Sequence, residues 1–255
     1  MRTAVRATTR LTVDLAGGPQ RVRWAHAWPV GLRQTGPRRV HLVHAAGGPL
    51  GGDELGLDVE IGAGAVLAVH SAGATLVQPG AGASAGTAAR WTVTTRVGAG
   101  GRLDWAPEPT VVADGAALES TLRVELASGA AATVREIVVL GRHGQRGGRY
   151  TGGLDVVVDG LPLLAHSTVL DGADPALCGP AGTAGARAVG TLVHAGVDLA
   201  REARGETSDV RWAWTSLDGP GAVLLAVGSP AAVTAVLDAA AAPADGRAAA
   251  PLARA

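Results

Sequence analysis

The chain has 255 residues, and its 22 basic side chains balance its 22 acidic ones, so the formal net charge is zero. This balance gives no support to nucleic-acid binding as the main role, and an apolar fraction of 47% can fill a core, which argues against wholesale disorder. The sequence contains no lysine, which excludes a Walker A lysine, a lysine Schiff base and a Ser–Lys dyad.

A glycine-rich stretch dominates the first quarter of the chain, after short alternating pieces such as residues 21–24. Residues 44–64 read HAAGGPLGGDELGLDVEIGAG, with two glycine pairs ahead of Asp53. The apolar residues that follow it share one parity, which is the period of a half-buried strand; they are Leu55, Leu57, Val59 and Ile61. The sequence therefore predicts a tight loop that holds an acid at the start of a strand.

One unit then recurs along the chain as strand, small-residue turn and strand. It spans residues 59–67, 95–103, 124–132 and 154–170, and the last unit turns at the hairpin dipeptide Asp159-Gly160. This quasi-repeat predicts an all-β fold in which successive hairpins are wound into helically arranged sheets. We interpret residues 1–255 as a single domain.

The C-terminal end has a different pattern, which predicts one or two helices. Ser229 is a suitable N-cap with Pro230 at the first helical position, and the helix is expected to end at about Ala241. Residues 180–208 fit either a strand or a strand followed by a short helix, and residues 243–255 read as a flexible tail. The apolar residues on one face of the main helix are Val233, Val236 and Leu237.

The glycine loop before Asp53 is open to three interpretations: a phosphate cradle, a metal site or a turn. Phosphate cradles place converging N–H groups at a helix N-terminus, whereas this loop leads into a strand. A tight connection that needs unusual backbone angles is the simplest interpretation.

The histidines and the single cysteine show no spacing typical of a tight metal site or a nucleophile. His41 and His44 lie three residues apart, so on a strand their rings point to opposite faces and cannot bind one ion. Ser71 follows His70 directly and forms no nucleophile–base pair with it for the same reason. Cys178 is the only cysteine, so no intrachain disulfide can form, which fits a reducing compartment. With no apolar run of membrane-spanning length, we expect a cytoplasmic protein that binds neither membrane nor nucleic acid.

Four motifs, taken together, resemble the urease accessory protein family UreD, also called UreH. They are GGPLGGDELGLDVEIGAGAVL from residue 47, HSAGAT at 70–75, LDWAPEPTVVADGAAL at 103–118 and REIVVLGR at 135–142. They occur in the family's order and cover roughly residues 40 to 170. The chain departs from the family pattern after Thr75, where Leu76 and Val77 replace the usual lysine and its neighbour, and at Pro107-Glu108-Pro109, where the usual glutamine is missing.

The resemblance implies a non-enzymatic scaffold for urease maturation. Such a scaffold binds apo-urease and the accessory protein UreF, through which the GTPase UreG brings nickel, and no tightly bound cofactor is expected. The family's fold contains a water-filled passage that is thought to carry nickel toward the urease active site. Weak oxygen or imidazole contacts suit an ion in transit. The candidate contacts in the matched motifs are His44, Asp53, Glu108, Asp114 and Glu136, and a loop or turn hydrogen bond is the alternative role for each acid.

Two other functions remain open from the sequence. Six tryptophans could form a carbohydrate-binding platform, since Trp212 and Trp214 share one strand face, although core or interface anchoring is the commoner use of tryptophan. A metal-dependent hydrolase built from Asp and His side chains is the other alternative, and it requires firmly held metal.

Overall fold

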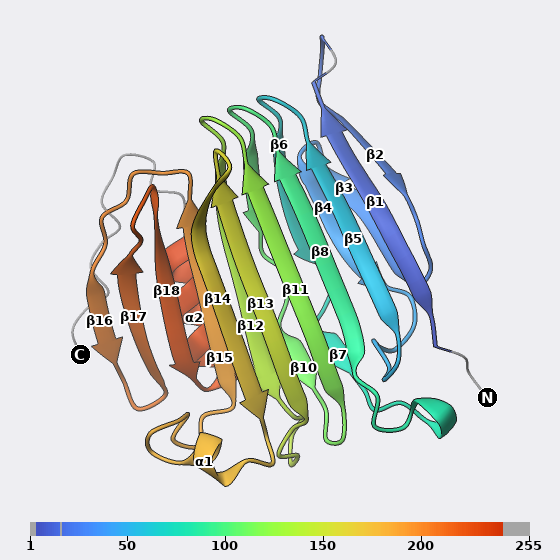
Figure 1. The fold of residues 1–255 in the computed structure, drawn as a ribbon, viewed down its shortest axis with the longest axis vertical. Coiled ribbons are helices and arrows are strands. Elements are labelled where there is room, and N and C mark those ends of the chain that lie inside the picture. Colours follow the sequence, from blue (N-terminus) through green and yellow to red (C-terminus); the bar gives the residue numbers. More distant parts are fainter. Residues whose placement is uncertain (1–3, 16, 242–255) are drawn as a thin grey trace.

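The computed structural model describes residues 4–15 and 17–241, and the predicted tail at 243–255 lies outside them. The described strands form two sheets, one of seven strands and one of eleven (Figure 1). The seven-stranded sheet has the order β14 (Leu161–Asp171), β13 (Arg149–Val158), β11 (Ala117–Leu126), β8 (Ala89–Val97), β5 (Glu54–Ile61), β1 (Arg6–Asp14) and β2 (Arg21–Ala25).

The eleven-stranded sheet lies behind the first in Figure 1. Its main path is β16 (Ala203–Glu206), β17 (Val210–Ser216), β18 (Gly221–Gly228), β15 (Ala188–Ala195), β12 (Ala131–Leu140), β9 (Arg102–Trp105), β6 (Val66–Ser71), β4 (Arg39–His44) and β3 (Val30–Gly36). Two short strands pair off this path, β7 (Thr75–Val77) and β10 (Thr110–Val112).

The chain winds between the two sheets, which confirms the all-β wound architecture and corrects the predicted pairing. The turns within 59–67, 95–103 and 124–132 carry the chain from one sheet to the other, so β5 pairs in parallel with β8 and not with β6. Only the predicted unit at 154–170 is an antiparallel hairpin, formed by β13 and β14. Alternation fixed which side chains are buried, but the same alternation suits a hairpin and a coil, so it did not identify the neighbouring strand.

The inward faces of the two sheets supply the main core. Leu57, Val93 and Leu122 are almost completely buried on the seven-stranded sheet and pack against residues such as Leu67 and Val134 of the other. A second cluster, around Val77, Val112 and Leu140, fills the space between the sheets at the other end of the strands. These two clusters bracket the candidate site described below.

The C-terminal third extends the larger sheet and covers its outer face with a helix. Residues 180–208 form β15 and β16 and not a strand–helix pair. Helix α2 (Pro230–Ala241) confirms the predicted bounds, and the Ser229 hydroxyl accepts a hydrogen bond from the Ala232 amide. Val233 and Leu237 are fully buried against the outer face of the sheet. The described chain also contains the short helices α1 (Pro175–Cys178) and a 3₁₀ turn at Gly82–Ser84, and none of its helices has the length and apolarity to cross a bilayer.

Candidate functional site

A belt of polar and aromatic side chains crosses the space between the two sheets. We call it the polar belt; it consists of His44, Thr75, Trp91, Ser120, Glu136 and Tyr150. Trp91 packs against both interior apolar clusters, so the belt lies where one cluster gives way to the other. Because most neighbouring inward positions are apolar, a continuous polar row here needs a reason beyond packing.

Glu136 is the charged member of the belt. On β12 it shares its inward parity with the buried residues Val134 and Val138, and Glu136 itself is half-buried. The surrounding protein removes its hydration, which raises the pKa of Glu136 to about 7. This carboxyl group therefore exchanges its proton near neutral pH, which suits a group that takes up and releases a cation.

Tyr150 and Ser120 lie next to Glu136 across the interior. Burial raises the pKa of the Tyr150 phenol, the negative charge of Glu136 raises it further, and a side-chain hydrogen bond with Ser120 opposes both effects. The Tyr150 side chain lies over Gly152, where a Cβ atom would come within 2.4 Å of the hydroxyl oxygen and 2.5 Å of the ring carbon Cε1. Glycine at position 152 thus makes room for the ring beside Glu136.

His44 forms the other end of the belt. Its Nε2 atom is 3.4 Å from the Thr75 hydroxyl, and its ring centroid is 5.8 Å from that of Trp91. Its Nδ1 atom is buried without a hydrogen-bond partner in the structure. Burial lowers the pKa of His44, so the imidazole is neutral at pH 7 and is able to coordinate a metal ion.

Asp53 sits on the glycine loop, outside the belt, and its contacts are those of a loop acid. It is 1% exposed, and its two carboxylate oxygens accept hydrogen bonds from the backbone amides of Val5 and Leu50, at 2.9 and 3.0 Å. Gly51 permits the close packing of this loop, because a Cβ atom there would lie 2.5 Å from the Gly80 nitrogen. The geometry thus favours the turn interpretation of the loop, and a transit role for Asp53 stays a prediction.

Glu108 and Asp114 lie at the surface and are not brought into the belt. The Glu108 side chain is exposed, and its backbone amide donates to the Ser71 hydroxyl at 2.9 Å. Asp114 is exposed in a turn, where its carboxylate accepts a hydrogen bond from the Gly147 amide. Of the five predicted residues, His44 and Glu136 therefore share the belt, and the nickel role of all five stays a prediction.

Sequence reasoning missed Tyr150, Ser120 and Trp91 as members of the belt. Their parity on β13, β11 and β8 placed them on the inward face, but the register that joins them is long-range, with Ser120 opposite both Trp91 and Gly152. Ser120 alone gave a signal in the sequence, because it is a polar residue with the same parity as the apolar Leu118 and Leu122.

The remaining candidate chemistry resolves into structural contacts. His41 stacks on His70 on the outer face while His44 points inward, which confirms that the two cannot share an ion. Trp214 is 5% exposed and packs with Trp212 in the cluster beneath α2, so this pair offers no sugar platform. Within residues 4–15 and 17–241, no three His, Cys, Asp or Glu side chains converge as metal ligands.

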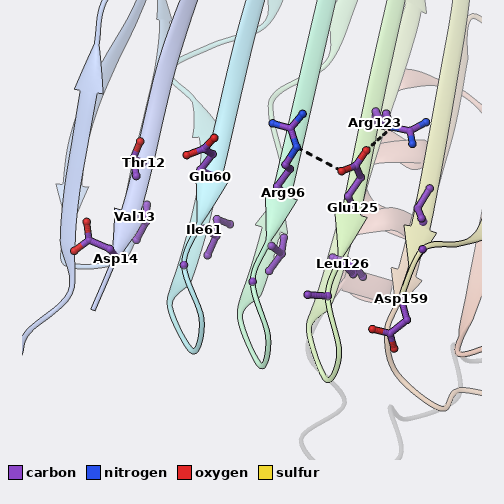
Figure 2. A pocket seen from close by; sticks show the side chains of 16 residues that line it. Thr12, Val13, Asp14, Glu60, Ile61, Arg96, Arg123, Glu125, Leu126 and Asp159 are labelled. Carbon is purple, nitrogen blue, oxygen red and sulfur yellow. Dashed lines mark hydrogen bonds and ion pairs between the residues drawn. The ribbon is translucent and has the colours of Figure 1, made fainter. Parts of the chain in front are cut away.

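The outer face of the seven-stranded sheet carries a broad, charged groove of about 880 Å³. Figure 2 shows Glu125 between two arginines, with its carboxylate 2.7 Å from Arg123 Nε and 3.5 Å from Arg96 Nε. The hydrogen bond from Arg123 lowers the pKa of Glu125.

Comparison with known proteins places the chain in a family. The profile of the UreD urease accessory proteins matches residues 2–252. The chain is 39% identical to the urease accessory protein UreD of Parafrankia sp., with 90% of this chain and 85% of the relative aligned. It is also 39% identical to UreD 1 of Saccharopolyspora erythraea, over 89% and 90% of the two chains, and 37% identical to UreD of Streptomyces avermitilis, over 88% and 90%. The chain belongs to the UreD family of urease accessory proteins.

Proposed function

We propose that the chain is a non-catalytic scaffold that binds apo-urease and other accessory proteins and assists nickel insertion into the urease active site. Membership of a family of urease accessory proteins supports a role in urease maturation. The observation that carries the nickel part is the polar belt, in which a carboxyl with a pKa of about 7 and a neutral imidazole line the space between the sheets.

The chemistry of the belt fits an ion in transit. Ni²⁺ accepts oxygen and imidazole ligands, so ionised Glu136 and the free Nδ1 atom of His44 are suitable successive contacts. Binding of the ion displaces the Glu136 proton, and the returning proton favours release. Because the described side chains form no cluster of three or more ligands, each contact is weak and the ion is not trapped.

The proposed partners are apo-urease and the accessory protein UreF, with the GTPase UreG recruited through UreF. The charged groove on the outer face of the seven-stranded sheet gives the scaffold a broad polar surface for such contacts. The single cysteine suits the reducing cytoplasm in which we propose that it works.

Urease activation in cells tests this proposal. Urease purified from cells that express the chain is expected to hold nickel and to co-purify with it at an intermediate stage, and urease from cells without the gene is expected to be largely apo. The Glu136→Ala variant should bind the partners but load nickel more slowly. Unchanged nickel content after deletion of the gene would contradict the function.

A further inference from the structure

Among the described strands, the eleven-stranded sheet extends past the edge of the seven-stranded sheet, and no strand of the smaller sheet covers this part of its inner face. Figure 1 shows β18, β17 and β16 beyond β14, with no strand of the smaller sheet in front of them. Leu225 is 40% exposed although β18 lies between two other strands. Its neighbours Leu224 and Ala226, on the opposite face beneath α2, are 0% and 1% exposed. The difference identifies an uncovered apolar face.

The neighbouring strand continues this bare surface. Arg211, Ala213 and Thr215 alternate on the inner face of β17, and all three are exposed. Ala213 lies directly opposite Leu225 in the strand register. We call the surface formed by Leu225, Ala213 and Thr215 the ledge floor. The edge of β14 forms its wall, since β14 pairs only with β13 in the described sheet.

The edge of β14 lacks the charges that guard the other sheet edges. No Asp, Glu, Lys or Arg occurs between Leu161 and Leu170, and Val169 is 69% exposed. Among the other edge strands, β2, β3 and β16 each carry arginine, whereas the three-residue β7, which pairs only with β10, carries no charge. Charged side chains on an edge strand discourage the addition of another strand. An uncharged edge beside the exposed ledge floor can therefore accept an added strand from another protein.

One end of the ledge is closed, which fixes where a strand fits. The register of β13 and β14 shifts after Val156, and the Leu163 side chain reaches the β17–β18 turn, within 2.8 Å of the position that a Gly219 Cβ atom would take. Pro162 has no amide hydrogen to donate at this end. The open part of the edge therefore runs from about His166 to Asp171, enough for an added segment of about five or six residues.

A second copy of the chain does not fit this position. Antiparallel pairing of two β14 strands in one continuous sheet requires a twofold axis perpendicular to that sheet, which puts both larger sheets on the same side. Each overhang of three strands, about 14 Å at the usual strand spacing, would then collide with the larger sheet of the other copy. A single narrow segment avoids this collision.

We propose that the ledge takes an extended segment of a urease-maturation partner, which adds to β14 as an eighth strand of the smaller sheet. The centre of the segment is uncharged, because residues 167–170 on the β14 edge and Leu225 and Ala213 on the floor carry no charge. Its ends are polar, because Asp171 closes that edge and Arg211 lies on the inner face of β17. Its alternate side chains are small or apolar and lie on the ledge floor. This inference rests on the proposed scaffold function and names the surface that it uses.

The test compares Leu225→Lys with Leu161→Lys in binding to purified apo-urease and to purified UreF. Leu161 is 72% exposed on the same strand at its closed end, which makes it a matched control. With the partner that uses the ledge, Leu225→Lys and Thr215→Lys are expected to weaken binding at least tenfold and Leu161→Lys less than twofold. Leu225 and Thr215 are both exposed, so the two lysine variants are expected to fold, and the Tm of each variant checks this.

Hydrogen exchange gives the second measurement. In the complex, the outward-facing amides of residues 166–171 are expected to exchange at least tenfold more slowly than in the free chain. Wild-type affinity in both floor variants, or unchanged exchange in the complex, would overturn the ledge while leaving the scaffold function intact. A wild-type dimer that Leu225→Lys dissociates would also overturn it. Failure of the wild-type chain to bind either partner would instead count against the scaffold function itself.

Discussion

Replacing Glu136 with glutamine removes the one titration that the polar belt places near neutral pH. In the unfolded chain this carboxyl has a pKa near 4.5, and burial in the fold raises it to about 7. Between these values the folded chain holds a proton that the unfolded chain has lost, so the free energy of unfolding falls as the pH rises and levels off above about pH 7. At about 1.4 kcal/mol per pH unit, the full loss is about 3 kcal/mol.

Glutamine has nearly the same shape and does not titrate, so Glu136→Gln is expected to escape this loss. Its gain in unfolding free energy over the wild type should be about 1 kcal/mol at pH 5 and about 3 kcal/mol at pH 8. Urea unfolding followed by circular dichroism at both pH values measures the two gaps. The control is Glu108→Gln, which replaces an exposed carboxylate outside the polar belt.

An equal gap at pH 5 and pH 8 would refute the reasoning, because it would mean that Glu136 ionises normally in the folded chain. A Glu136→Gln variant that is less stable than the wild type at pH 8 would refute it as well. That result would show the carboxylate to be held by favourable contacts and not penalised by burial.

Three further predictions, two of them with a control substitution, test the fold around the site. Arg135→Ala should lower the free energy of unfolding by about 3 kcal/mol, measured by urea titration. The Arg135 side chain is only 8% exposed, and it donates hydrogen bonds to the carbonyls of Ala106 and Pro107 as well as to Asp238. Asp238→Ala is the control and should lower the same free energy by less, because the Asp238 side chain is 55% exposed. Asp53→Ala leaves two backbone amides without their acceptor and should cost about 2 kcal/mol, with faster amide exchange at the loop as the local readout. Gly51→Ala should lower the Tm by several degrees because its Cβ atom meets backbone, whereas Gly73→Ala, with open space around it, should not.

The sequence predicted the local elements well because local physics determines them. Alternation placed the strands and their buried faces, and the N-cap at Ser229 with Pro230 placed α2. The sequence did not predict which strands pair with one another, since a glycine turn such as that at 62–64 connects two strands equally well within one sheet or between two. The quasi-repeat therefore predicted that the sheets are wound in succession, and the structure supplied the pairing of the strands.

The site shows the same division between local and long-range information. The sequence named Glu136 as a candidate contact without placing it on either face of its strand, and its neighbour Tyr150 lies on a strand of the other sheet. Asp53 stood out because of its glycine loop, and the structure gives it backbone amides as partners. The glycine-rich pattern around Asp53 thus marked a turn, whereas the titratable residues of the polar belt, such as Glu136 and Tyr150, have no distinctive pattern around them.

The most direct test of the account is the nickel content of urease matured in cells that carry the wild-type chain, Glu136→Gln or Glu119→Gln, since Glu119 is exposed on β11 and is not a candidate contact. The account predicts that Glu136→Gln leaves the complex with apo-urease intact but lowers nickel per urease active site severalfold, whereas Glu119→Gln stays at the wild-type level. Full nickel content with Glu136→Gln would contradict the claim that the polar belt carries the ion.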